Sequence, residues 1–280
     1  MAIIIPEVFA QMVTEKVKGI VKISKSAVDL GVLGDFSQEG DSISFPQFCA
    51  LSDAELLSKG SDITTEELRQ TSTKKSVKHY SKGVSVYDVD AKEGKGNFVE
   101  NAIMQQARIF AKARDNEMVA DIDANAILKV PTSFADKLKE DELMSAFQLW
   151  GDDQDNESIE GIYINSRLAP SFYAMDGFVN SNKTYTKEGN GEVVNGCIGY
   201  YRGTIPVILT DVNTYDENAK ECKSYIIKKG ALGKKDKTNG VNIELDRVAK
   251  QKKTDIYADE MFVCGLIQKD GVVVLRKTIA

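Results

Sequence analysis

The sequence predicts an α+β fold without βαβ repetition or internal repeats. Three observations support this prediction. A long polar excursion over residues 40–87 leaves and returns in extended stretches, an uninterrupted helical pattern covers residues 97–129, and the C-terminal part is rich in strand patterns. With 280 residues and a hydrophobic fraction of 42%, the chain is long enough to bury a full core.

An amphipathic helix is expected over residues 6–23. Pro6 suits the first position of a helix, and Phe9, Val13 and Val17 recur near helical spacing. A linker over residues 31–40 separates this helix from the rest of the chain. The sequence leaves open whether the helix packs on its own domain or on a neighbouring copy.

The polar excursion reads as a two-stranded arm. Ile43 and Phe45 alternate with polar residues, and Pro46 is typical of an edge strand because proline has no N–H to donate. The chain returns through a second extended run over residues 71–86. An isolated hairpin is marginal in water, so the arm must lie on another surface, either of its own domain or of a second copy.

A long helix is expected over residues 97–129. Asn97 and Glu100 resemble a capping box, and no glycine or proline follows until Pro131. About 33 residues at ~1.5 Å each give a rod of roughly 50 Å, which we interpret as a spine. Its apolar face, interrupted near Arg114 and Asp115, consists of Val99, Ile103, Ala107, Phe110, Met118, Val119, Ile122 and Ala126.

Shorter elements follow the spine. They are a helix around residues 136–149 and strands at 159–164, 204–209, 241–245, 261–267 and 272–275. Asp270-Gly271 lies between the last two strands and predicts a short-loop hairpin.

Composition excludes several classes of protein. The net charge of −6 and the pI of about 5.1 argue against a dedicated nucleic-acid binder. Four widely separated cysteines (Cys49, Cys197, Cys222 and Cys264) indicate reduced thiols. No run approaches the ~18 apolar residues of a membrane span, and the N-terminus lacks the pattern of a signal peptide. We expect a soluble protein that is made in the cytoplasm.

The sequence contains no motif that identifies a catalytic, cofactor-binding or metal-ligating residue. The one histidine, His79, lies among lysines and reads as a solvated strand residue. Residues 230–235 contain glycines and lysines without phosphate-loop spacing, and indicate a basic loop. Gly94 and Gly96 open the long helix and indicate a hinge between the arm and the spine.

Two acidic patterns resemble parts of cation sites. Asp121, Asp123 and Asn125 imitate the start of a calcium loop, but Ala126 stands where that loop needs glycine. The acidic cluster of Asp152, Asp153, Asp155 and Glu157 favours a solvated loop. We therefore predict that the protein is not an enzyme and has no cofactor.

Charge is unevenly distributed along the arm. Residues 35–69 carry eight acidic residues against Lys59 and Arg69, whereas residues 71–82 carry four lysines and no acid. Such runs usually face water. The alternative hypothesis is charge complementarity between copies, which would fix register.

An ordered series of motifs then resembles a known family. The series consists of GDSISFP at 40–46, KHYSKGV at 78–84 followed by Asp88, the helical pattern at 97–129, INSRL at 164–168, GYYRGTIPV at 199–207 and ELDR at 244–247 followed by Thr254-Asp255. It is similar to the major capsid (coat) proteins of tailed bacteriophages, which share the Hong Kong 97-type capsid fold. Ser166 departs from the family pattern, which often has proline there.

This resemblance implies an α+β architecture with an N-terminal arm (1–35), an extended β-hairpin loop (36–92), a spine helix of the peripheral domain (93–130), an axial domain (131–224) and a β-rich return to the peripheral domain (225–280). It also implies a function. Copies would self-assemble as hexamers and pentamers into an icosahedral shell around a double-stranded DNA genome.

The partners expected on this basis are the protein itself, scaffold, portal or decoration proteins, and non-specifically contacted DNA, with no membrane. The expected location is the virion, after assembly in the host cytoplasm. Two alternatives remain open. One is a bacterial nanocompartment (encapsulin-like) shell protein, and the other is a carboxylate-dependent enzyme.

Overall fold

The structure is a computed structural model of the chain. It describes residues 6–32, 42–48, 56, 65–67, 70–93, 98–152, 154–180, 196–210, 212, 214–237 and 240–278. Among these residues no helix is long and apolar enough to cross a membrane.

The helices are α1 (Pro6–Ile20), α2 (Asp88–Glu93), α3 (Phe98–Asn125), α4 (Glu140–Gln148) and α5 (Ala169–Tyr173), with 3-10 turns η1 (Asn156–Ser158), η2 (Ser166–Leu168) and η4 (Ala249–Gln251). The strands are β1 (Val28–Val32), β2 (Ser42–Phe48), β3 (Gln70–Ser76), β4 (Lys78–Tyr87), β5 (Leu128–Pro131), β6 (Ile159–Ile164), β7 (Phe178–Asn180), β8 (Cys197–Tyr201), β9 (Ile205–Leu209), β10 (Tyr215–Asp216), β11 (Glu221–Cys222), β12 (Ser224–Lys228), β13 (Leu232–Asp236), β14 (Asn242–Val248), β15 (Lys253–Leu266) and β16 (Val272–Arg276). The predicted α+β class is confirmed.

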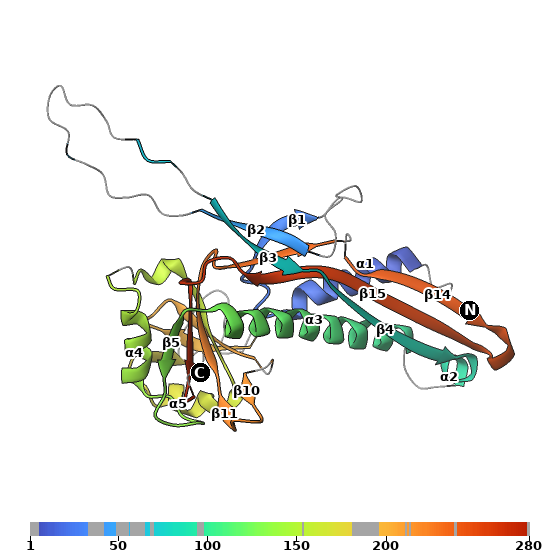
Figure 1. The fold of residues 1–280 in the computed structure, drawn as a ribbon. Coiled ribbons are helices and arrows are strands. Elements are labelled where there is room, and N and C mark those ends of the chain that lie inside the picture. The colour runs from blue at the N-terminus through green and yellow to red at the C-terminus, as the bar shows by residue number, and fades with distance from the viewer. Residues whose placement is uncertain are drawn as a thin grey trace.

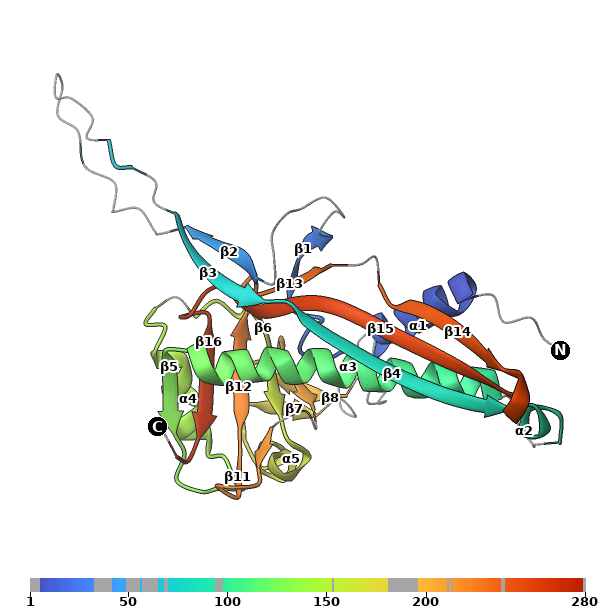
Figure 2. The same cartoon turned by 45° about the vertical axis from the view of Figure 1, so that its right-hand side comes forward.

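Two large sheets form the two halves of the molecule. The elongated half is a five-stranded sheet in the order β1-β13-β15-β14, with β4 on the opposite edge of β15. The compact half is a seven-stranded sheet in the order β5-β16-β12-β6-β9-β8-β7. The helix α3 runs along the elongated half and reaches the compact half with its C-terminal end (Figures 1 and 2).

The apolar stripe of α3 serves both halves, which explains why the helix is so long. Its N-terminal part packs Ile103, Ala107 and Phe110 against α1, β14 and β15. Its C-terminal part packs Met118 and Ile122 against one face of the seven-stranded sheet. Burial of these side chains is the main favourable term in joining the halves.

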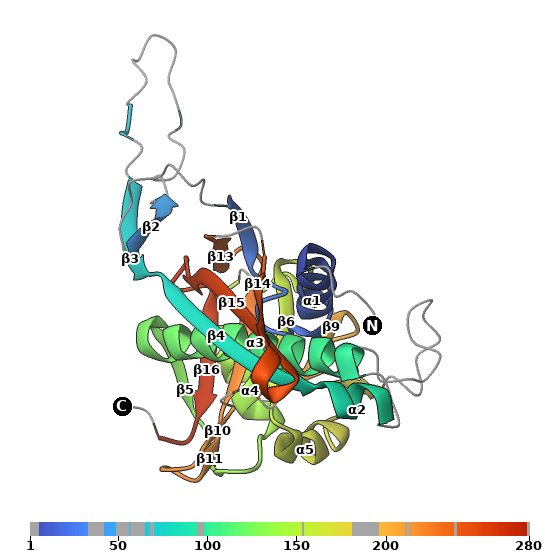
Figure 3. The same ribbon diagram turned by 90° about the vertical axis from the view of Figure 1, so that its right-hand side faces the viewer.

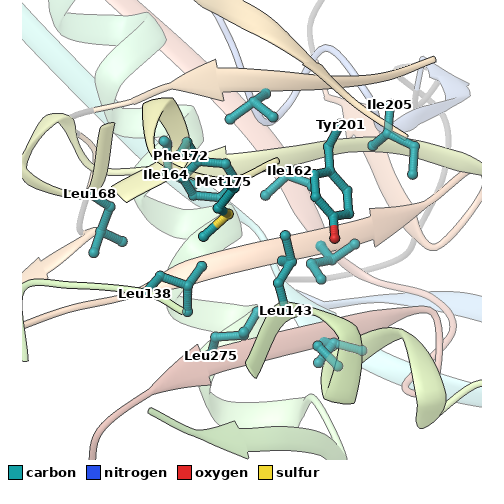
Figure 4. Packing of buried hydrophobic residues seen from close by; sticks show 14 of the residues in the cluster. Leu138, Leu143, Ile162, Ile164, Leu168, Phe172, Met175, Tyr201, Ile205 and Leu275 are labelled. Atoms are coloured by element: carbon teal, nitrogen blue, oxygen red, sulfur yellow. The ribbon is translucent and has the colours of Figure 1, made fainter. Parts of the chain in front are cut away.

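The opposite face of the seven-stranded sheet is covered by α4 and α5. Leu143 and Phe172 from these helices meet Ile162, Ile164 and Leu275 from the sheet (Figure 4). Side chains alternate along β16, so that Val272 and Val274 face α3 whereas Val273 and Leu275 face α4 and α5. Both faces of the sheet are therefore core.

The helix α1 packs on its own chain, which settles the choice left open by the sequence. Phe9, Val13 and Val17 are buried against α3 and β14. The end view shows α1 beside the five-stranded sheet, opposite β4 (Figure 3). The turn after α1 is fixed by Asp115, whose two carboxylate oxygens accept the N–H groups of Lys22 and Ser24 at 2.9 and 2.8 Å.

The spine helix is shorter than predicted. It ends at Asn125, because the N–H of Ile127 turns to Lys269 O and residues 128–131 form β5, parallel to β16. The predicted capping residue Asn97 and the hinge at Gly94 and Gly96 lie outside the described residues. Residues 128 and 129 continue the helical pattern in the sequence, but residues 128–131 form a strand because the edge of β16 is available to pair with them.

The predicted Asp270-Gly271 hairpin is wrong. The strand β15 belongs to the five-stranded sheet, whereas β16 lies between β5 and β12 in the other one. Both edges of β16 are occupied, so it cannot pair with β15. The turn at residues 268–271 instead carries the chain from one sheet to the other.

The segment predicted as one β-rich return (225–280) is divided in the same way. Its strands β13, β14 and β15 join the elongated half, and its strands β12 and β16 join the compact half. The other predicted domain limits stay a prediction.

Candidate assembly surfaces

A hairpin of β2 and β3 leaves the body of the subunit (Figures 1 and 2). Its antiparallel register runs from Ser42 opposite Ser76 to Phe48 opposite Gln70. Among the described residues neither strand pairs with a third, so the expectation that Pro46 lies in an edge strand is confirmed. Leu56, on the segment that joins the two strands, is fully exposed. An exposed leucine and two open strand edges are features that a neighbouring molecule can cover.

The root of the hairpin is seated on its own subunit. Ile43 and Phe45 are 2% and 1% exposed and pack with Val263 of β15, beside Leu30 and Val77. The arm therefore begins inside the fold, and of the two surfaces that the sequence left open, its own domain supplies the one beneath the root.

The return strand is also part of the fold. The strand β4 pairs with β15 over its whole length, from Lys78 opposite Phe262 to Tyr87 opposite Lys253. On this strand the Tyr80 ring stacks on Phe262 at 5.6 Å, and its hydroxyl donates to Glu117 of α3. Burial and the hydrogen bond to Glu117 raise the pKa of Tyr80 to about 12.

Two of the arm lysines pair within the subunit. Lys75 forms an ion pair with Asp121 of α3, and Lys78 Nζ lies 3.6 Å from Glu117 Oε2. Lys74 and Lys82 are exposed. Charge complementarity between copies is therefore wrong for Lys75 and stays a hypothesis for Lys74. Most of the acidic residues of the arm lie outside the described residues.

A buried charged cluster links α3 to the five-stranded sheet. Arg114 Nη2 lies 2.7 Å from Glu260 Oε1 and 2.8 Å from Asp236 Oδ1. Burial raises the pKa of Glu260, and the ion pair with Arg114 offsets only part of this rise. A cavity of about 350 Å³ lies beside the cluster, between α1 and β13. The sequence signal for this cluster was the interruption of the apolar stripe at Arg114 and Asp115.

Some of the exposed large apolar side chains belong to elements at two ends of the molecule. Tyr87, Val89 and Phe98 lie around α2, at the far end of the elongated half (Figure 1). On the compact half, the exposed large apolar side chains include Ile127, Phe134, Met144, Leu149, Tyr173 and Val179. Both ends present apolar area that suits contact between copies.

The residues weighed for chemistry are dispersed and have structural partners. His79 is half exposed on β4, with Nε2 3.5 Å from Asp259. Asp121 and Asp123 diverge, since Asp121 accepts the Leu266 N–H whereas Asp123 pairs with Lys223 at 2.7 Å. No group of metal-ligating side chains is assembled within the described part of the chain.

The basic loop, the acidic cluster and the cysteines noted in the sequence also take structural positions. The predicted basic loop is wrong in part, because residues 232–236 form β13 and Lys234 Nζ donates to Ser24 O. Asp152, Asp155 and Glu157 surround the exposed turn at η1, while Asp153 lies outside the described residues. Cys197, Cys222 and Cys264 are free thiols with pKa values raised by burial, and Cys49 is not described.

Comparisons with known proteins address the fold directly. No protein-family model matches the chain. A major capsid protein of Staphylococcus phage phiMR11 is 26% identical over 276 residues, which cover 98% of this chain and 93% of that protein. The capsid structure of cyanophage P-SCSP1u superposes with a TM-score of 0.62 at 12% identity, covering 93% of this chain and 89% of that one. A virus-like particle from Pyrococcus furiosus superposes with a TM-score of 0.55 at 14% identity, over 96% and 98% of the two chains.

These likenesses identify the class: the chain has the Hong Kong 97-type fold of capsid shell subunits. The resemblance to phage major capsid proteins predicted from the motif series is confirmed. The nanocompartment alternative is not favoured, because the sequence relative that spans the chain is a phage capsid protein.

Proposed function

We propose that this protein is the major capsid protein of a tailed bacteriophage, and that its copies assemble into a closed shell around double-stranded DNA. The observation that carries the proposal is the match to a phage major capsid protein over 98% of the chain. The hairpin of β2 and β3 supports it independently, because both of its strand edges are open and Leu56, on the segment that joins the strands, is fully exposed.

In such a shell the subunits form hexamers and pentamers whose heterologous contacts close by symmetry. Obligate interfaces of ~2,000–5,000 Å² hold assemblies of this kind. The apolar ends at α2 and at α4 and α5 and the projecting hairpin are the surfaces that supply this area. Scaffold, portal and decoration proteins are the proposed further partners, and assembly takes place in the host cytoplasm.

The proposed role is structural rather than enzymatic. The net charge of −6 favours weak, non-specific contact with the packaged DNA, because an acidic surface repels phosphates. Tight binding of the shell to the genome would hinder packing and release.

The test is electron microscopy of the purified full-length protein, alone and with its scaffold partner. Hollow particles or rings of five and six subunits are expected. A sample that stays monomeric at high concentration under both conditions would contradict the proposal. Turnover of a substrate by the monomer would favour the enzyme alternative instead.

A further inference from the structure

The hairpin is connected to the body through a very short covalent link. The strand β3 ends at Ser76 and β4 begins at Lys78, so Val77 alone separates the strand of the hairpin from the strand of the body sheet. A single residue between two strands is a place where the direction of the hairpin can change, because its two backbone dihedrals set that direction.

A polar contact ties the hairpin side of this link to the body. Lys75, on the hairpin side of Val77, forms an ion pair with Asp121 of α3, and the two side chains are 10% and 17% exposed. Asp121 is itself held in place. Its Oδ2 accepts the Leu266 N–H at 2.7 Å, and its Oδ1 accepts from Asn125 Nδ2 at 2.8 Å. Lys75 is therefore tied to a carboxylate that two elements of the body have already fixed.

The backbone of β15 leaves room for this contact. A Cβ at Gly265 would lie 2.5 Å from Asp121 Oδ2 and 3.3 Å from Lys75 Cε. Any larger residue would displace the carboxylate or the lysine. Gly265 thus keeps α3, β15 and β3 close enough for the three to meet at one point.

We propose that the Lys75–Asp121 contact is a positioning contact that fixes the direction in which the β2–β3 hairpin leaves the subunit. This inference rests on the proposed function, since a hairpin of defined direction matters when a second copy of the chain must receive it. The apolar seat of Ile43 and Phe45 supplies affinity for the body, but apolar contact is non-directional. A partly buried ion pair with a fixed carboxylate supplies the orientation.

The experiment measures hairpin direction in the unassembled subunit. Spin labels carried by non-natural amino acids are placed at Ser72 on β3 and Ala120 on α3, both exposed, and the distribution of distances between them is recorded. The wild type is expected to give one narrow distribution. Lys75→Met and Asp121→Asn are each expected to lose it in favour of a broad one.

Two matched controls accompany these variants. Lys75→Arg keeps the cation and is expected to retain the narrow distribution. Lys78→Met removes the lysine on the body side of Val77 and is expected to retain it too. If Lys75→Met fails to fold, the distance distribution of Asp121→Asn alone tests the proposal. Narrow distributions in Lys75→Met and Asp121→Asn alike would overturn the proposal, as would a broad one in the wild type.

Assembly is then compared on the same samples. Loss of the contact is expected to replace closed shells of uniform size by open or irregular ones. A wild type that forms no shell would refute the proposed function, whereas the distance measurement in the free subunit would still test the positioning contact. The two failures are thus distinguishable.

Discussion

Arg114 on α3 reaches Glu260 on β15 across 146 positions of sequence, with Nη2 2.7 Å from Oε1 and both residues buried. Asp236 of β13 joins them, so one guanidinium serves two carboxylates from neighbouring strands. The contact fixes the middle of the spine helix to the sheet that it supports.

Replacing Arg114 by Met should destabilise the subunit strongly. The change leaves the buried Glu260 and the partly exposed Asp236 without their cation, and the loss of one partner of a buried pair such as Arg114–Glu260 costs roughly 3–5 kcal/mol. Urea unfolding followed by circular dichroism measures this free energy. Arg247→Met, which removes the exposed pair with Asp88, serves as the control and should have a much smaller effect. Equal losses in the two variants would mean that the cluster does not hold the helix.

Replacing Phe110 by Ala tests the assigned face of α3. Phe110 is 1% exposed within the core shared by α1, α3 and β15, so its truncation should cost roughly 3–5 kcal/mol of unfolding free energy. Its neighbour Ile109 is 44% exposed, and Ile109→Ala should change stability by less than about 1 kcal/mol. Similar losses for both positions would contradict the face assignment.

Shortening the arm should separate folding from assembly. Phe48 and Gln70 are register partners, so a two-residue Asn-Gly turn can replace residues 49–69 and close the hairpin in its native register. The root, with Ile43 and Phe45 in their seat, is retained. Circular dichroism should report a folded subunit, and sedimentation should report the loss of shells.

A matched variant exchanges residues 49–69 for a Gly/Ser linker of equal length. If side chains of residues 49–69 contact a neighbouring copy, this variant should fold like the shortened variant and should also fail to form shells. Normal assembly of the shortened protein would show that the segment is not needed between copies.

Charge reversal should affect two neighbouring arm lysines, Lys74 and Lys75, differently. Lys74→Glu should leave folding intact and make assembly more sensitive to salt, because exposed charges are screened over ~8–10 Å at ordinary ionic strength. Lys75→Glu places a second carboxylate beside Asp121 and should destabilise the subunit itself. Urea unfolding and sedimentation at low and high salt measure the two effects. If the urea midpoint of Lys75→Glu equals that of the wild type, the Lys75–Asp121 ion pair does not stabilise the fold.

Ionisation of Tyr80 should couple stability to alkaline pH. Its pKa is about 12 in the folded subunit, above the ordinary value of 10.0, chiefly because of burial and then because of Glu117. A raised pKa means that the folded state holds the proton more tightly. The stability gained from Tyr80 is therefore complete below pH 10 and disappears as the pH rises towards 12. Between pH 10 and 12, Tyr80→Phe should lose less unfolding free energy than the wild type. Urea unfolding at each pH measures this free energy. An identical pH dependence in the two proteins would show that Tyr80 is not the group responsible.

Several elements were predictable because their signal is local. The apolar stripe around Phe110, the strand at residues 159–164 and the edge position of Pro46 follow from periodicity and backbone chemistry. The partners of Arg114 were not predictable, since nothing in the sequence connects that position to Glu260. Asp270-Gly271 misled for a related reason. Turn chemistry reports that the chain bends, but not which sheet receives the next strand.

The charge of the arm shows the same limit. A run of lysines over residues 74–82 looks uniform in the sequence. In the structure, alternation along β3 turns Lys75 inward to Asp121 while Lys74 faces outward. Whether a charge serves the fold or a neighbour is decided by the face of the strand, which requires the register with β2 to be known.

The position of β16 has a consequence for synthesis. Of the strands in the seven-stranded sheet, β16 comes last in the chain, yet it lies inside the sheet between β5 and β12. Until residues 272–276 have been synthesised, β5 and β12 have no strand between them, because β16 is the strand that pairs with both. A chain that lacks residues 272–276 therefore leaves β5 without its partner strand and removes Val273 and Leu275 from the core beneath α4 and α5, so the compact half is completed only when β16 is present.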